Sequence, residues 1–194
     1  HMVSSVAVPT GPSILEISQM MSKKADLFKF LAEEKWDAAI ALMSDFPKLA
    51  EQEEEHTRRL PLHIVAEHNL HAVVEKVYNL YPGGADAFDK DGRLPIHVAA
   101  EHDTLVPLKF LLSKHPAGAD TMKLRPTGRL GGGIPLHSAC KANASGTVIT
   151  ALLSHNFSSA KKSDANGDLP IHLLLRNGSN VSGTVVQALL DIYP

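Results

Sequence analysis

The chain has 194 residues, with 19 Lys and Arg against 21 Asp and Glu, a net charge of -2 and 44% hydrophobic residues. This near-neutral balance gives no bulk attraction to nucleic acid or an anionic membrane, and we expect neither as a partner. The single cysteine excludes an internal disulfide, and no uncharged apolar run approaches the roughly 20 residues that span a bilayer, so we expect an intracellular, cytoplasmic protein without direct membrane insertion.

The N-terminal residues differ in character from the rest of the chain. Residues 1–12 begin with His1 and Met2, which we interpret as a tag remnant, and continue into a Pro- and Gly-containing leader that we expect to be disordered. Residues 13–57 are expected to form N-terminal helices and a capping repeat with a polar outer surface. The helices that we predict there cover residues 13–21, 26–34 and 37–43.

A four-residue motif, Leu or Ile, Pro, Leu or Ile, then His, recurs along the remaining chain. It occupies residues 60–63, 94–97, 134–137 and 169–172, with the histidines 34, 40 and 35 residues apart. Proline in this position suits the first turn of a helix, where its missing N–H costs nothing. The spacing predicts four repeats, at residues 58–91, 92–131, 132–166 and 167–194.

Each motif is followed by apolar residues at the spacing of one helix face, which predicts a second helix in every unit. These residues form three columns that we expect to be core: Val74, Leu108, Ile149 and Val186; Val77, Leu111, Leu152 and Leu189; Tyr78, Leu112, Leu153 and Leu190. The same columns precede Pro47, so a first unit with only the second helix is also expected.

A period near 34 residues built from a turn and two helices resembles the ankyrin repeat family, whose signature is Thr-Pro-Leu-His. The resemblance covers roughly residues 24–194. It implies an all-α solenoid of about five helix-turn-helix units with finger loops and an L-shaped cross-section. The tetratricopeptide repeat has the same period but would show a Trp or Leu, Gly, Tyr pattern in the first helix, and the only tryptophan is Trp36.

The motif departs from the family at one position. Leu or Ile stands where the family has threonine, so the hydroxyl that helps fix the start of the first helix is missing. What satisfies the N–H groups at these helix starts is left open by the sequence.

The link between the second and third motifs is six residues longer than the others and covers residues 121–133. In the ankyrin family this link forms a protruding finger, a usual site of partner contact. A longer, Gly-rich and basic finger therefore indicates a contact site, although a neutral insertion accounts for it equally well because loop closure entropy grows slowly with length.

No constellation of catalytic, cofactor-binding or metal-binding residues stands out, so we expect no enzyme activity and no cofactor. The motif histidines recur with the repeat, and partners such as His63 and His68 are five apart rather than the four typical of zinc helices. Cys140 occupies a column otherwise held by alanine and is expected to be a buried thiol.

The function that we expect is protein–protein interaction, with a scaffold that binds a partner protein or peptide through its concave face and fingers. The candidate partner-binding residues are Glu67, Arg93, Glu101, His102, Arg125, Thr127, Arg129, Lys141 and Arg176. With 5% aromatic residues, few tight anchors are available, which favours a transient or multivalent interaction.

Two alternatives stay open. The chain could be a regulatory or targeting domain of a larger enzyme or channel, and in that case further repeats or domains are expected beyond Pro194. The 121–133 finger could instead bind an anion or a phosphopeptide.

Overall fold

The computed structural model describes residues 13–124, 132–176 and 183–192, and within these ranges the protein is all-α with no β-strand. The candidate residues Arg125, Thr127 and Arg129, the centre of the 121–133 finger, the leader 1–12 and residues 177–182 lie outside the described residues. The α-helices are α1 Ile14–Ala32, α2 Trp36–Asp45, α3 Pro61–Val65, α4 His71–Leu80, α5 Pro95–Glu101, α6 Leu105–Lys114, α7 Pro135–Ala142, α8 Gly146–His155, α9 Pro170–Arg176 and α10 Gly183–Leu190.

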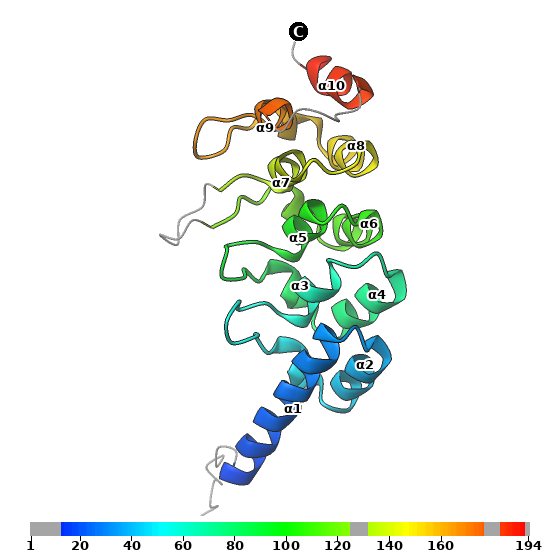
Figure 1. Cartoon of the computed structure of the whole chain (residues 1–194), viewed down its shortest axis with the longest axis vertical. Helices are drawn as coiled ribbons and strands as arrows, with labels where there is room; N and C mark the ends of the chain where they lie inside the picture. The colour runs from blue at the N-terminus through cyan, green and yellow to red at the C-terminus, as the bar shows by residue number, and fades with distance from the viewer. Residues whose placement is uncertain (1–12, 125–131, 177–182, 193–194) are drawn as a thin grey trace, which may run out of the picture.

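The helices form two layers in an elongated array (Figure 1). The odd-numbered helices α1 to α9 pack on one another in chain order, and the even-numbered helices α2 to α10 do the same beside them. A short 3-10 helix follows each of the even-numbered helices α2 to α8. These are η1 Pro47–Glu51, η2 Pro82–Asp86, η3 Pro116–Asp120 and η4 Phe157–Lys161. The links that follow them project on the side of the odd layer (Figure 1).

Each motif histidine accepts a main-chain hydrogen bond at the start of its own helix. This bond caps the helix start in the absence of the family's threonine. The N–H of Leu60 donates to Nδ1 of His63 at 3.2 Å, and the N–H of His63 donates back to the Leu60 carbonyl at 2.9 Å. The residue in the threonine position is instead a packed apolar side chain, since Leu60 is 3% exposed. The same bond to a histidine Nδ1 recurs from Leu94 to His97, Ile134 to His137 and Leu169 to His172.

Most residues of the predicted core columns are buried, whereas Tyr78 and Val186 are only half-buried. Val74, Leu108 and Ile149 are each at most 1% exposed, and the second column is equally buried. The prediction is wrong for Leu190, which is 46% exposed, because no described helix packs over that side of α10. Cys140 is buried as predicted.

The N-terminal helices differ from the prediction. Residues 14–32 form one continuous helix rather than two, because no Gly or Pro interrupts them and most are good helix formers. Ser13 caps this helix: its hydroxyl accepts from the Glu16 N–H at 3.3 Å, and the Glu16 carboxylate accepts from the Ser13 N–H at 2.7 Å. Within the described residues, none of the helices has both the length and the apolar character needed to cross a membrane.

Candidate partner-binding surface

Most of the candidate residues lie at fixed offsets from the motif histidines, on the edge where the links meet the odd-numbered helices. The residue four after each histidine stands at or near the end of the first helix, and the residue four before it ends the preceding link. These offsets give the pairs Arg59 and Glu67, Arg93 and Glu101, Gly133 and Lys141, and Asp168 and Arg176. We call the set of these eight positions the charged edge.

Arg93 is the centre of the largest ion-pair cluster on the charged edge. Its guanidinium donates to Asp89 at 2.9 Å and to Glu101 at 3.0 Å, and it lies 3.0 Å from Asp91. The Arg93 side chain is only 19% exposed, and the Asp89 carboxylate is fully buried. Asp89 also accepts the N–H groups of Asp91 and Arg93, so it shapes the turn as well as neutralising the arginine.

Glu101 connects this cluster to the next link, because its other oxygen pairs with the Lys123 ammonium group. Burial by itself would raise the pKa of the Glu101 carboxyl. The two cations, Lys123 and Arg93, outweigh burial and hold that pKa below its ordinary value. Glu101 is therefore ionised and fixed in position at neutral pH.

A second cluster joins α3 to α5. Arg59 donates to the carboxylate of Glu67 and, at 3.3 Å, to the carbonyl of His63. Nε2 of His102 lies 3.2 Å from the same carboxylate, from the next unit along the array. The structure thus brings together two candidate residues, Glu67 and His102, that sequence offsets alone do not pair.

The last unit carries the same pair with its charges exchanged. Asp168 stands where Arg59 and Arg93 stand, and Arg176 donates to its two oxygens at 2.9 and 3.0 Å. The bond from Arg176 lowers the pKa of the Asp168 carboxyl. Lys141 occupies the intermediate position on α7 and is exposed. The residue four positions after the motif histidine is therefore acidic in the first two units, as Glu67 and Glu101. It is basic in the last two units, as Lys141 and Arg176.

Main-chain bonds join the first three links along the charged edge. The N–H of Lys90 donates to the Thr57 carbonyl at 2.8 Å, and the N–H of Leu124 donates to the Gly92 carbonyl at 2.9 Å. The long link closes at its base, where Lys123 and Gly133 are joined by an N–H to carbonyl bond of 2.9 Å. The side chains of neighbouring units are consequently held in a fixed register.

Sequence reasoning missed the residues that hold the candidates in place. Arg59, Asp89, Lys123 and Asp168 were not among the candidates, although each contacts one of them. The offset of eight residues between the members of each pair was the available signal for Arg59 and Asp168. No such signal identifies Lys123, because its partner is set by the packing of one link on the next helix.

Two buried motif histidines and the cysteine are held in their neutral forms at physiological pH. Burial lowers the pKa of His63 to about 4 and that of His97 to about 3, so both are neutral at physiological pH. Burial raises the pKa of the Cys140 thiol to about 12, so the thiolate is scarce. Within the described ranges, no group of three or more His, Cys, Asp and Glu side chains could hold a metal ion.

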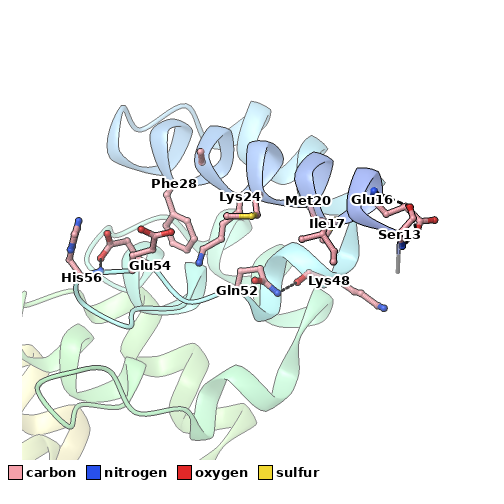
Figure 2. A pocket seen from close by; sticks show the side chains of 13 residues that line it. Ser13, Glu16, Ile17, Met20, Lys24, Phe28, Lys48, Gln52, Glu54 and His56 are labelled. Carbon is pink, nitrogen blue, oxygen red and sulfur yellow. Dashed lines mark hydrogen bonds between the residues drawn. The ribbon is translucent and has the colours of Figure 1, made fainter. Parts of the chain in front are cut away.

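A second surface lies outside the nine candidate residues, at the N-terminal end of the array. A groove of about 1150 Å³ runs between residues 13–28, which cover most of α1, and residues 48–56 (Figure 2). Its apolar lining includes Ile17, Met20 and Phe28. The i, i+3 spacing of Ile17 and Met20 was visible in the sequence, but it could not show that Ile17 stays 45% exposed to solvent.

Comparison of the chain with protein-family models gives no match, and neither does a search of curated proteins.

Proposed function

We propose that this chain is a protein-binding module with an ankyrin-type repeat arrangement, in which the charged edge contacts the partner. Three features support the ankyrin-type arrangement: the Pro-x-His motif at a period near 34, paired helices that stack in two layers, and links that project on one side. A stack of this kind buries a quasi-one-dimensional core and leaves a long surface for contact.

The single observation that carries the proposal is the change of charge along the edge. Around α5, Asp89, Asp91 and Glu101 give three formal negative charges against two on Arg93 and Lys123. On α7 the corresponding residue is Lys141, and on α9 it is Arg176, whose charge is balanced by Asp168. The partner that fits is a segment with a basic part over α5 and an acidic part over α7.

The ion pairs support binding because they fix the charged side chains before the partner arrives. Glu67 and Glu101 are each about one-fifth exposed, so they stay accessible while their rotamers are restricted by Arg59 and Arg93. A preorganised charged group loses less conformational entropy on binding than a free one. The edge therefore favours selectivity and fast association over very high affinity.

The experiment is a comparison of affinity purifications from an extract of the source cells, followed by titration of each purified candidate partner. The variant is Lys141→Glu with Arg176→Glu, and the control is Lys76→Glu with Lys109→Glu, which makes the same charge change on exposed positions of α4 and α6. A true partner binds wild type and control alike and loses at least about tenfold in affinity for the edge variant. If every captured protein binds all three forms equally, the charged edge is not the binding surface.

Shortening the 121–133 finger by six residues tests the finger separately. The base of this link is anchored by Lys123 and Gly133, so the array should keep its stability after the deletion. A partner that uses the finger loses affinity in the shortened form while thermal unfolding is unchanged. Unchanged affinity would restrict the contact to the charged edge.

A further inference from the structure

The outer side of α9 and α10, the last two helices of the array, is apolar, and no described helix lies beyond it (Figure 1). Leu175 on α9 is 55% exposed, and Leu190 on α10 is 46% exposed. Val186, one turn before Leu190, is half-buried. We call these three residues the terminal face. Exposed apolar side chains that gather at one place on a protein mark a contact surface.

The positions of the terminal face are buried in the earlier units. The residues that correspond to Leu175, three after the motif histidine, are each 0% exposed: Ala66, Ala100 and Cys140. Leu112 and Leu153, which correspond to Leu190, are at most 7% exposed. Each earlier unit is covered by the next one, since α5 packs on α3 and α7 on α5, while α6 packs on α4 and α8 on α6. The terminal face is therefore one half of an interface that the array already contains.

The polar groups that join one unit to the next also lack partners at this end. Nε2 of His63 and of His137 lies 3.0 and 3.1 Å from a main-chain carbonyl of the following link. The corresponding His172 side chain is 51% exposed, and its Nε2 makes no hydrogen bond or ion pair with a described residue. The Gly92 carbonyl accepts an N–H from the following link, whereas the Gly167 carbonyl, at the same offset from its motif, accepts none within the described ranges.

The even-numbered layer has a different surface at its N-terminal end. The exposed residues of α2 are alanines and polar residues: Asp37, Ala38, Ala41, Ser44 and Asp45. An end helix that faces only water in a stacked array needs such a polar surface. Because α10 exposes Leu190 instead, its outer side has the character of a helix that another helix covers.

We infer that the terminal face binds one further helix-turn-helix unit of the same polypeptide, which stacks on α9 and α10 as α7 and α8 stack on α5 and α6. Nε2 of His172 donates to a main-chain carbonyl in the link that leads to this unit. The unit carries a small residue opposite Leu175, because leucine is larger than the alanine or cysteine of the earlier units. The contact uses none of the eight residues of the charged edge, so it adds to the proposed function.

The size of the terminal face favours a unit of the same chain over a separate protein. With seven and eight residues, α9 and α10 are about 10 and 12 Å long at 1.5 Å per residue. Side by side at the usual interaxial distance, they present about 250 Å² in projection. Separate proteins that associate stably bury about 800 Å² each. A tethered unit needs no such area, because its short link sets a high local concentration.

The coding transcript tests the source of the unit. Sequencing it from the source cells should show a reading frame that continues past Pro194 and contains a further Pro-x-His motif. The histidine of that motif should lie 34–40 residues after His172, the range of the three spacings within the chain. A stop codon directly after Pro194, or a continuation without the motif, overturns the inference.

A lengthened chain tests the stacking. Tyr193 and Pro194 match Tyr81 and Pro82, so a copy of residues 83–116 placed after Pro194 adds a link, α5 and α6 in register. The urea m-value should rise by about one-sixth, in proportion to the added residues, and the unfolding midpoint should also rise. A Gly-Ser tail of the same length is the control and should change neither quantity.

Substitutions of Leu175 locate the contact. Leu175→Glu should leave the midpoint of the 194-residue chain unchanged, because the side chain is exposed, and should abolish the gain in the lengthened chain. Leu15→Glu is the matched control: Leu15 is 68% exposed on α1, and its substitution should alter neither form. Leu175→Ala gives the copied unit the small residue that it meets in its own place. A lengthened chain that gains no stability with either Leu or Ala at this position overturns the inference.

Other occupants give different results. A dimer of the 194-residue chain that sediments as such and disappears in Leu175→Glu would assign the face to a second copy. A captured protein from another transcript that loses binding in Leu175→Glu would assign it to a separate partner. Either result overturns the inference. Loss of partner binding in charged-edge variants concerns only the proposed function, so the two proposals fail separately.

Discussion

The imidazole Nε2 of His63 lies 3.0 Å from the main-chain carbonyl of Arg93, which belongs to the next unit 30 residues along the chain. Nδ1 of the same ring accepts the Leu60 N–H, so the proton is on Nε2 and the ring donates to Arg93. His137 makes the same contact with the carbonyl of Asp168 at 3.1 Å. One neutral ring thus fixes the start of its own helix and the position of the next link.

This bridge predicts that mild acid destabilises the protein. The native pKa of His63 is about 4, against 6.5 for a free histidine, so below pH 6.5 the unfolded chain binds protons that the native chain does not. The free energy of unfolding should therefore fall as pH is lowered from 6.5 toward 4, by about 1 kcal/mol per pH unit for each such histidine. Urea unfolding at a series of pH values measures this slope, and substituting His63 with Asn should reduce it. A flat profile between about pH 7 and pH 5 would contradict the neutral-ring assignment.

Gly92 is predicted to be intolerant of any side chain. It adopts a φ of +72°, and a Cβ built there would lie 2.1 Å from the Leu124 carbonyl oxygen of the neighbouring link. Gly167 is the matched control, because its φ is +82° but a Cβ there meets nothing within 4 Å. Gly167→Ala should cost about 1 kcal/mol of backbone strain, and Gly92→Ala about 2 kcal/mol more. Chemical denaturation of the two variants decides this, and equal losses would mean that the two links do not touch.

Arg93 and Glu101 are predicted to be energetically coupled. Both side chains are about four-fifths buried, so solvent screens their attraction weakly. A double-mutant cycle with Arg93→Met and Glu101→Gln should give a coupling of about 1–2 kcal/mol in the free energy of unfolding. The exposed pair of Arg58 and Glu53 serves as the control and should show no measurable coupling, because water surrounds both groups. Similar values for the two pairs would show that burial does not set their strength.

Cys140 is predicted to be unreactive in the folded protein. It lies on α7 and is fully buried, and burial raises its thiol pKa to about 12. Because the thiolate is the reacting species, a disulfide reagent such as dithionitrobenzoate should label the native protein only as fast as it unfolds. The same reagent should label one thiol at once in concentrated guanidinium chloride, since this is the only cysteine. Rapid labelling without denaturant would contradict the burial.

The sequence predicted the all-α class and most of the core, because these follow from local patterns. Helix periodicity predicted the burial of Val74, Leu108 and Ile149, and it failed for Leu190 because burial there needs a neighbouring helix that periodicity cannot supply. The predicted break after residue 21 was also wrong. A helix boundary inferred from composition has no support unless a Gly, Pro or capping residue marks it.

The candidate surface was predictable only in part. Repeat offsets placed Glu67, Glu101, Lys141 and Arg176 at equivalent positions, which is a property of the sequence alone. That Glu101 pairs with Lys123, and that Glu67 meets His102, depends on how one unit packs on the next.

For this protein, the order of residues along the chain determined where helices start and which of their faces are apolar, since both depend on contacts within about four positions. Tertiary structure alone decided which charges neutralise one another and which apolar residues, such as Ile17, are left uncovered. Those outcomes depend on distances between residues far apart in the chain, and only the packed array sets those distances.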